Sequence, residues 1–303
     1  MVKHFLHISD YSKEELLDIL HLAKELKIKF RNREDYTPFK NCSLAMIFAK
    51  PSARTRVSFE TGFEWMGGSA LFLGPNDIGI GKREAIKDIS RLFSRYNDMI
   101  MARLFDHKNI LELAQYSSIP VINGLTDYNH PCQVIADILT ISEHRDSLED
   151  LHVCYVGDGN NVVHSWLQLA SRLPMKFTCV CPEGFAPDED TVKLARENSG
   201  SEIVITHDPI GGVQSADVIY TDSGHVEAIE VTYDSSKINY QKLLDNNNNV
   251  KIIYIEWPIF GDISNTASNL AILVWNNHPE KYFDVHNGLM KLGSRMKKDN
   301  IIS

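Results

Sequence analysis

Short apolar runs alternate with helix-like segments along most of the chain, and this pattern most constrains its fold. Each run is about four to eight residues long and is bounded by turn residues, which is typical of a buried strand. Strands that alternate with helices pair in parallel, because each helix carries the chain back to the start of the next strand. The predicted strands are 42–49, 70–73, 99–102, 120–123, 152–156, 177–181, 202–206, 217–220 and 252–255. The predicted helices are 58–65, 86–96, 131–143, 162–172, 189–197 and 285–296, preceded by one that starts at the capping-box pattern of residues 12–15.

A polar, charged stretch at residues 144–149 separates two such sets of strands and helices. Stretches of this kind are typical of joints between domains. The 303 residues, of which 43% are hydrophobic, are enough to build two separate cores. We therefore expect an α/β protein with two domains, each a parallel sheet flanked by helices.

The composition argues against several classes of protein. A net charge of −9 is opposite to that of a nucleic-acid or anionic-membrane binder. No apolar run is long enough to span a bilayer, and the first residues lack the apolar core of a signal peptide. The five cysteines are an odd number and several lie in apolar runs, which indicates reduced thiols. We expect a cytoplasmic protein that binds neither nucleic acid nor membrane, in which Cys179 and Cys181 are buried as small hydrophobic side chains rather than metal ligands.

The segment Ser52-Ala53-Arg54-Thr55-Arg56 lies where a predicted strand turns into a helix. The free N–H groups at a helix start favour an anion, and hydroxyl groups and a forked guanidinium add further donors. The alternative is a helix cap with two surface arginines, but capping does not need arginines on both sides of a threonine. Because open α/β sheets bind ligands at such turns, the segment predicts an anion site.

Three more polar side chains stand near strand ends. His130 and Gln133 belong to a His-Pro-Cys-Gln segment that follows a strand and starts a helix, and Arg103 follows the strand at 99–102. A histidine there can donate to a carbonyl oxygen, and a glutamine can hold an amide. The alternatives are a capping histidine and a surface arginine. Such groups at successive strand ends predict a shared pocket.

Residues 157–161, Gly-Asp-Gly-Asn-Asn, also follow a predicted strand. They begin like a dinucleotide-binding fingerprint, but Val162 stands in place of the third glycine. Nicotinamide binding is therefore the minor alternative to a tight turn that presents Asn161 to a substrate. The sequence contains no Walker loop, zinc-ligand set or Gly-x-Ser-x-Gly elbow, so we expect neither a cofactor nor a metal.

Together these segments resemble the aspartate/ornithine carbamoyltransferase superfamily, and within it most closely the ornithine transcarbamylase branch. The resemblance is dense from about residue 46 to residue 220 and rests on residues 48–60, 123–127, 130–133 and 157–161. It implies two α/β domains with the active site between them, and a trimer as the basic assembly. It also implies transfer of a carbamoyl group from carbamoyl phosphate to an acceptor amine, with release of phosphate.

The resemblance further implies a role for each matched position. Residues 1–145 would bind carbamoyl phosphate, residues 146–284 would bind the acceptor amine, and residues 285–303 would form a helix that packs back on the first domain. Thr55, Arg103 and His130 would polarise the carbonyl group, and Gln133 would hold the amino group of the donor. The full set of implied donor-binding residues is Ser52, Ala53, Arg54, Thr55, Arg56, Arg103, His130 and Gln133.

On the acceptor side, Asn161 and Asp222 match positions that hold the amino-acid end of ornithine, but the sequence then departs from the family. The family's Ser-Met-Gly loop is replaced by residues 223–225, Ser-Gly-His. His225 and Glu227 in this loop are candidate contacts to a different acceptor. The family's His-Cys-Leu-Pro segment aligns with residues 255–258, so Glu256 replaces the cysteine. Glu256 would bind the acceptor ammonium or act as its general base.

Two further family features are missing. The family has a late arginine that reaches the donor, but this chain has no arginine between Arg196 and Arg295. A position that reaches the neighbouring subunit's site falls near Gly79, where Lys82 is the candidate substitute. These departures predict a carbamoyltransferase whose acceptor site is altered from that for ornithine. The alternatives are an ordinary ornithine carbamoyltransferase that makes citrulline, and a non-catalytic homologue that keeps the anion site. The predicted partners are carbamoyl phosphate, a small amine, and further copies of the chain in a homotrimer or a multiple of trimers.

Overall fold

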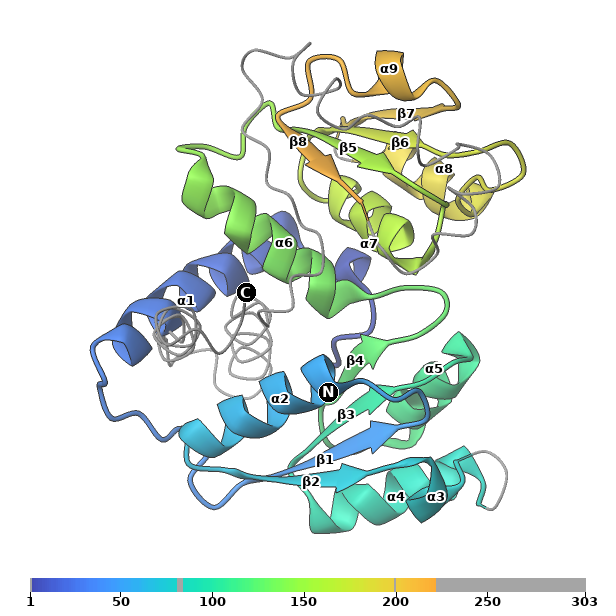
Figure 1. Cartoon of the computed structure of the whole chain (residues 1–303). Coiled ribbons are helices and arrows are strands. Elements are labelled where there is room, and N and C mark those ends of the chain that lie inside the picture. Colours follow the sequence, from blue (N-terminus) through green and yellow to red (C-terminus); the bar gives the residue numbers. More distant parts are fainter. Residues whose placement is uncertain (1, 81–83, 199, 222–303) are drawn as a thin grey trace, which may run out of the picture.

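The computed structural model describes residues 2–80, 84–198 and 200–221, which form two parallel four-stranded sheets flanked by helices (Figure 1). This is the predicted α/β architecture. The elements in chain order are η1 (Ile8–Asp10), α1 (Lys13–Arg31), β1 (Ser43–Phe48), α2 (Ala53–Trp65), β2 (Ser69–Leu73), α3 (Pro75–Ile78), α4 (Ile86–Tyr96), β3 (Met99–Arg103), α5 (His107–Tyr116), β4 (Val121–Leu125), α6 (Pro131–His144), β5 (His152–Val156), α7 (Asn161–Ala170), β6 (Lys176–Val180), α8 (Glu189–Glu197), β7 (Glu202–Thr206), α9 (Pro209–Gly212) and β8 (Val218–Tyr220).

The first sheet has the strand order β2-β1-β3-β4, and all neighbouring strands are parallel. Successive side chains point to opposite faces. Ala45, Ile47 and Ile100 belong to the core cluster that includes α4 and α5, whereas Leu44 and Met46 belong to the cluster of α1, α2 and α6. The chain order reverses between β1 and β3, which are neighbours although β2 lies between them in sequence. Ligands of open α/β sheets bind beyond the carboxyl ends of the strands at such a reversal.

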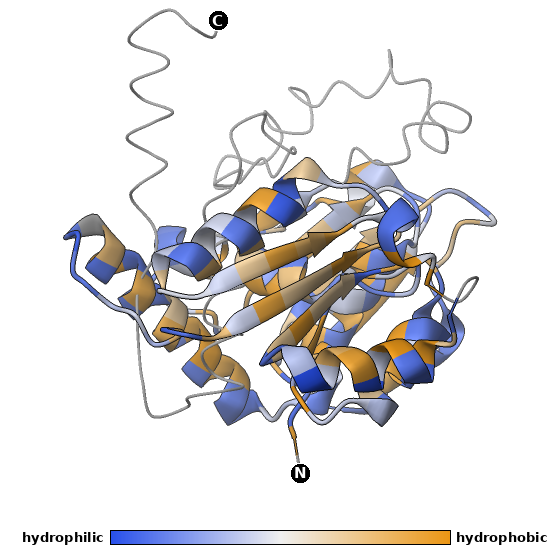
Figure 2. Ribbon diagram, turned by 90° about the horizontal axis from the view of Figure 1, so that it is seen from below, coloured by the Kyte–Doolittle hydropathy of each residue, from blue (hydrophilic) through white to orange (hydrophobic). Residues whose placement is uncertain are grey.

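The second sheet repeats this plan with the order β7-β6-β5-β8. Its reversal lies between β5 and β8, so the turn after β5 is the corresponding position in this half. Cys179 and Cys181 are fully buried, which confirms their predicted burial. In Figure 2 the strands are hydrophobic along most of their length, while many helices carry a hydrophilic side. Such strands are covered on both faces, as the alternation of strands and helices requires.

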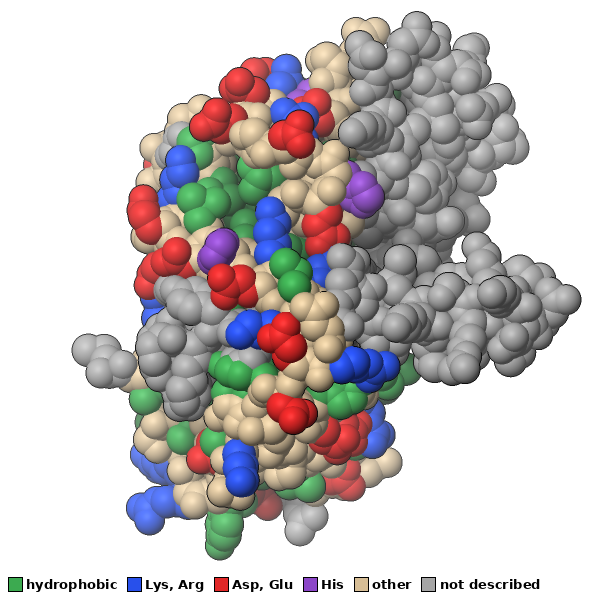
Figure 3. Space-filling view, turned by 90° about the vertical axis from the view of Figure 1, so that its left-hand side faces the viewer, with side chains coloured by type: hydrophobic (Ala, Val, Ile, Leu, Met, Phe, Trp, Pro, Cys, Tyr) green, Lys and Arg blue, Asp and Glu red, His purple; other side chains and the backbone are tan. Residues whose placement is uncertain are grey.

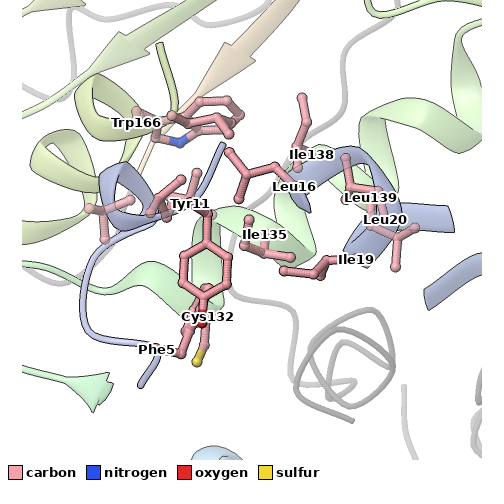
Figure 4. Packing of buried hydrophobic residues seen from close by; sticks show 14 of the residues in the cluster. Phe5, Tyr11, Leu16, Ile19, Leu20, Cys132, Ile135, Ile138, Leu139 and Trp166 are labelled. Atoms are coloured by element: carbon pink, nitrogen blue, oxygen red, sulfur yellow. The ribbon is translucent and has the colours of Figure 1, made fainter. Parts of the chain in front are cut away.

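Helix α6 joins the two halves of the molecule. Its residues from Pro131 to Leu139 are all buried, so it has no polar outer stripe along that stretch. One cluster of buried side chains runs from the first sheet through α1 and α6 into the second sheet. Figure 4 shows this packing near Trp166 of α7, with labelled side chains Leu16, Ile19 and Leu20 from α1 and Ile135, Ile138 and Leu139 from α6.

Most predicted elements agree with the structure. The predicted ranges 86–96, 152–156, 189–197 and 202–206 are the observed ones, and most others differ by one or two residues at an end. The prediction for 58–65 was wrong at its start, because α2 begins at Ala53, directly after its cap Ser52. Helix α5 was not predicted. The strand at 252–255 and the helix at 285–296 lie outside the described residues.

The surface of the described part is mixed in charge. On the face shown in Figure 3, acidic and basic side chains are interspersed, unlike the continuous basic surface typical of nucleic-acid binders. Within residues 2–80, 84–198 and 200–221, no helix is both long and apolar enough to cross a membrane.

Candidate active site at the carboxyl edge of the first sheet

The turn after β1 is closed by Ser52, which caps α2. Its Oγ accepts a hydrogen bond from the backbone N–H of Thr55 at 3.3 Å and donates one to Thr55 Oγ1 at 3.0 Å. A serine cap leaves the other free N–H groups of the first turn directed out of the helix start. The hydroxyl groups and the helix terminus therefore form the kind of anion-binding turn that the sequence predicts.

The two arginines of this turn have different surroundings. Arg56 Nε donates to Glu60 Oε2 at 2.8 Å, and its guanidinium lies 3.9 Å from the centre of the Phe72 ring. These contacts hold Arg56 against its own helix and β2. Arg54 is exposed on the first turn of α2, and its charge acts on Arg103. Arg54 is therefore the better placed of the two to meet an anion at the helix start.

Arg103 ends β3 beside the turn. The strand ends lie together, because Phe48 pairs with Arg103 and the Ala49 N–H donates to the Arg103 carbonyl at 2.9 Å. The side chain is 8% exposed, and its Nη1 donates to Thr55 Oγ1 at 3.3 Å. Burial, helped by the nearby charge of Arg54, lowers the pKa of Arg103 to about 10, so it stays cationic at neutral pH.

His130 is the N-cap residue of α6 and is also buried. Its backbone N–H donates to Ser165 Oγ of α7 at 2.8 Å. Burial, followed by the charges of Arg103 and Lys50, lowers the pKa of the imidazole to about 3. His130 is therefore neutral at physiological pH and keeps one N–H to donate.

Two buried nitrogen atoms of these side chains stand out. Among the described residues, neither Arg103 Nε nor His130 Nδ1 has a hydrogen-bond partner. Buried polar nitrogens normally have partners, because leaving one unsatisfied costs about 1–3 kcal/mol. Their occurrence beside the anion-binding turn points to a ligand that supplies acceptors.

Lys50 is a site residue to which the sequence analysis gave no role. Its Nζ lies 3.5 Å from Asp127 Oδ1, and its charge contributes to the low pKa of His130. The available signal was its position two residues before the Ser52 cap, in the same strand-to-helix turn. Lys50 adds a further cation to the edge where an anion is expected.

Gln133 lies in the first turn of α6 and contacts the buried side chain of Asp137. Its Nε2 donates to Asp137 Oδ1 at 2.8 Å, and both residues are buried. Its backbone N–H donates to the His130 carbonyl at 3.2 Å, which ties it to the helix start. Asp137 was not predicted as a site residue, although its i, i+4 spacing from Gln133 on a predicted helix was a usable signal.

The glycine-containing turn after β5 has a steric explanation. A Cβ at Gly159 would lie 2.2 Å from the backbone nitrogen of Pro187, so only glycine fits there. Asn160 caps α7 by accepting from the N–H of Val162 at 2.9 Å. Asn161 Nδ2 donates to the Thr126 carbonyl at 2.7 Å. The turn therefore carries Asn161 to the boundary between the halves.

One face of α7 holds the segment 126–130 of the first half. Asn161 bonds Thr126 and Ser165 bonds His130, as described above, and His164 Nδ1 lies 2.7 Å from the Tyr128 carbonyl oxygen. We call Asn161, His164 and Ser165 the α7 clasp. Because the clasp holds the backbone beside His130, the second half of the molecule fixes the position of a candidate catalytic residue.

The remaining candidates divide into two groups. Asp222, His225, Glu227, Glu256 and Lys82 lie outside the described residues. Gly79 is described and ends α3 with φ 59°, a left-handed conformation that favours glycine. In the described ranges, no group of three or more His, Cys, Asp or Glu side chains is placed to hold a metal ion.

Both halves of the chain match family models. Residues 3–143 match the model described as aspartate/ornithine carbamoyltransferase, carbamoyl-P binding domain, and residues 149–246 match its Asp/Orn binding domain. The chloroplastic ornithine carbamoyltransferase of Pisum sativum is 56% identical over 222 residues, which are 73% of this chain and 59% of that protein. The ornithine carbamoyltransferase of Anoxybacillus flavithermus is 50% identical over 223 residues, 73% of this chain and 71% of that protein.

Solved structures agree with these matches. The ornithine carbamoyltransferase from Pyrococcus furiosus has a TM-score of 0.81 and 34% identity, over 92% of this chain and 98% of that one. The mitochondrial ornithine carbamoyltransferase from Coccidioides immitis has a TM-score of 0.81 and 28% identity, over 91% of this chain and 97% of that one.

Proposed function

Because the chain belongs to the aspartate/ornithine carbamoyltransferase family, we propose that it transfers the carbamoyl group of carbamoyl phosphate to the side-chain amine of ornithine. The observation that carries the proposal is the contact of buried Arg103 with Thr55, beside neutral His130, at the strand reversal of the first sheet. Relatives named ornithine carbamoyltransferase, at 56% and 50% identity, support ornithine as the acceptor. They favour the ordinary enzyme over the altered-acceptor enzyme that the sequence departures suggested.

The donor would lie across the carboxyl edge of the first sheet. The phosphate group would be held by the N-terminus of α2 together with Ser52 and Thr55. Arg54, exposed on the first turn of α2, would bind it from the solvent side. The carbonyl oxygen would lie between Arg103 and His130, where the two unpartnered nitrogens are found. This division of roles places the anionic end on the helix terminus and the reacting carbon beside two N–H donors.

The reaction needs neither a covalent intermediate nor a metal, since carbamoyl phosphate already carries a good leaving group. The neutral amine attacks the carbonyl carbon, and the C–O π electrons move to the oxygen, where Arg103 and His130 stabilise the negative charge. The oxyanion then collapses, the bond to the phosphate oxygen breaks, and phosphate leaves while the new C–N bond remains. The surplus amine proton goes to the departing phosphate or to solvent. The protein's contribution is to orient the donor and stabilise charge.

The two halves of the chain would have separate roles, and the chain would assemble with further copies of itself. We assign donor binding to residues 1–145 and acceptor binding to residues 146–284, and we propose a trimer. Exposed apolar side chains on α2 and β2, including Val57 and Leu71, are 53% and 51% exposed and support association through the first half. Light scattering would give the mass of the assembly.

The pea relative is named as chloroplastic, and a cytoplasmic location for this chain stays a prediction.

The test is phosphate release that depends on carbamoyl phosphate, measured with a panel of amines. Ornithine should give stoichiometric phosphate and citrulline, whereas aspartate and putrescine should give neither above the rate without acceptor. If none of the amines gives phosphate release above the rate without acceptor, while inorganic phosphate still binds, the protein is instead a non-catalytic homologue.

The altered-acceptor enzyme remains a second candidate, because Ser223-Gly224-His225 and Glu256 depart from the family sequence. It predicts that a different amine gives the highest kcat/KM in the same panel. Glu256→Gln should then lower turnover with that amine and change its pH profile, while the affinity for carbamoyl phosphate stays the same. Ornithine as the preferred acceptor, with wild-type turnover in Glu256→Gln, would exclude this candidate.

A further inference from the structure

A buried hydrogen bond on α6 orients the side chain of Gln133. Gln133 Nε2 donates to Asp137 Oδ1 at 2.8 Å, and the two residues are 5% and 0% exposed. They lie one helical turn apart, on the same face of α6. Asp137 has no role in the catalytic scheme, although an acidic side chain is costly to bury in this position.

The chemistry of this pair fixes which end of the amide faces Asp137. The amide NH₂ is the end that faces Asp137, since Nε2 donates to Oδ1 at 2.8 Å, and an ionised carboxylate would enforce this orientation because it only accepts hydrogen bonds. The Gln133 carbonyl oxygen is then turned away from Asp137. An amide oxygen has two lone pairs, so it can accept from a ligand N–H even where a protein donor uses the other.

Gln133 is close to the reacting end of the proposed donor. Its backbone N–H bonds the carbonyl of His130, whose ring lies near the charges of Arg103 and Lys50. The phosphate-binding turn of α2 lies beyond Arg103, which contacts it through Thr55. A ligand that spans from that turn to His130 would therefore bring its acyl group, and not its phosphate, toward Gln133.

We propose that Asp137 is a positioning residue that holds the Gln133 carbonyl oxygen toward the donor, and that the pair selects a carbamoyl over an acetyl group. The inference rests on the proposed function. Carbamoyl and acetyl phosphates differ only in an NH₂ or a CH₃ of similar size, so the phosphate contacts cannot tell them apart. An oriented buried acceptor can, because it bonds the NH₂ and is left unsatisfied against the CH₃. If Asp137 is removed, the amide can rotate and present its own NH₂, and this selectivity is lost.

The experiment uses the full-length protein and a pair of stable analogues. Phosphonoacetamide and acetonylphosphonate have a methylene in place of the labile oxygen that bridges the acyl carbon and phosphorus. They differ from each other only in that the first has an NH₂ where the second has a CH₃. Their affinities, with that of inorganic phosphate as reference, are measured by calorimetry in the wild type and in Asp137→Leu. The wild type should prefer the amide by roughly 10- to 100-fold. Asp137→Leu should bring this ratio to within about threefold of unity, with phosphate affinity unchanged.

Two further variants keep the test decisive. Asp137→Asn preserves the volume if Asp137→Leu does not fold, and because asparagine can donate as well as accept, the ratio should still fall by roughly threefold or more. Thr140→Val, which removes a hydroxyl bond to the Ala136 carbonyl on the same helix, is the matched control and should keep the wild-type ratio. An unchanged ratio in a folded Asp137 variant would overturn the inference, and so would an equal loss for all three ligands. Failure of the proposed function shows separately, as absence of citrulline formation in the wild type.

Discussion

The carboxyl edge of the first sheet, where we propose that the donor binds, and the corresponding edge of the second sheet differ in how their polar groups are used. Beyond β1 and β3, Arg103 and His130 are buried close to the α2 turn, and each has a nitrogen without a partner among the described residues. Beyond β5, the Asn161 amide is instead bonded to the Thr126 carbonyl at 2.7 Å. The first edge is organised to receive a ligand, while the described part of the second edge is organised to hold the first half. A small rigid donor can be recognised by one turn and two strand ends, but a longer acceptor needs residues from further along the chain.

The largest expected effect is at His130, which belongs to the donor edge but is held by the second half. His130→Ala should lower kcat by roughly 10²- to 10³-fold, because the N–H that stabilises the oxyanion is lost. Donor affinity should change much less, since this interaction strengthens only as charge develops. Steady-state kinetics with direct binding of carbamoyl phosphate would measure both.

The pH profile tests the same residue in the wild type. Because burial lowers the pKa of His130 to about 3, its imidazole is neutral at any pH above that value. The profile of kcat/KM from pH 5 to 9 should therefore contain no acid limb due to His130. An acid limb that disappears in His130→Gln would mean that the imidazole titrates in this range.

The next effect separates the two arginines of the donor turn. Arg54→Ala should lower the affinity for inorganic phosphate by roughly 10- to 100-fold, since a charge-assisted hydrogen bond is lost. Arg56→Ala should cause a smaller loss, because Arg56 is already bonded to Glu60 and packed on Phe72. Calorimetric titration of both variants compares them directly. A larger loss for Arg56 would reverse the assignment.

The second edge should respond differently. Asn161→Ala should raise the KM for ornithine by roughly tenfold, if its amide leaves Thr126 to bind the acceptor, and should leave the phosphate affinity within about twofold. Ser165→Ala, which removes another member of the α7 clasp without touching the acceptor, is the control for loosening of the two halves. An equal rise in KM in both variants would mean that Asn161 acts only by holding the halves together.

The smallest effect is on stability, at a contact between the N-terminal segment and α5 within the first half. His107 Nε2 lies 2.8 Å from His7 Nε2, and burial followed by the charge of His7 lowers the pKa of His107 to about 4. In the unfolded chain the His107 imidazole binds a proton near pH 6.5, whereas in the folded protein it does so only near pH 4. The free energy of unfolding therefore decreases as the pH is lowered from about 6.5 to about 4. After allowance for partial exposure, we expect a loss of about 1–2 kcal/mol. Urea unfolding of the wild type and of His107→Gln between pH 4 and 7 would measure this loss. The same dependence of the free energy of unfolding on pH in both proteins would contradict it.

Local patterns explain which parts of this molecule were predictable. The strands of both sheets are short apolar runs ended by turns, so periodicity found all those described, and the Ser52 and His130 turns were found because each follows such a run. The predicted helix range 58–65 began too late, although the Ser52 turn was predicted to open a helix, because the first turn of α2, Ala-Arg-Thr-Arg, has no apolar periodicity, as expected for residues that face the sheet edge rather than the core.

Contacts between distant residues account for the rest. Nothing in the sequence near His130 indicates that Ser165, 35 positions further on, receives its N–H. The same holds for Lys50 and Asp127, which follow β1 and β4 and meet only because both strands end at the same edge of the sheet, on either side of β3. Asn161 was predicted from its turn, but its bond to Thr126 depends on how the two halves pack.

The core that passes through α6 has a consequence for folding. Leu139 and Ile138 belong to the same buried cluster as side chains of both sheets, so neither half covers its own apolar surface completely. A fragment ending near residue 145 would expose the face of α6 that packs on α7, at a cost of about 25 cal/mol for each Å² of apolar surface left in water. The two sheets should therefore unfold in one cooperative transition, although each resembles an independent unit in strand order. Cleavage in the segment that joins α6 to β5 would break the chain without separating its halves, because the shared core would still hold them together.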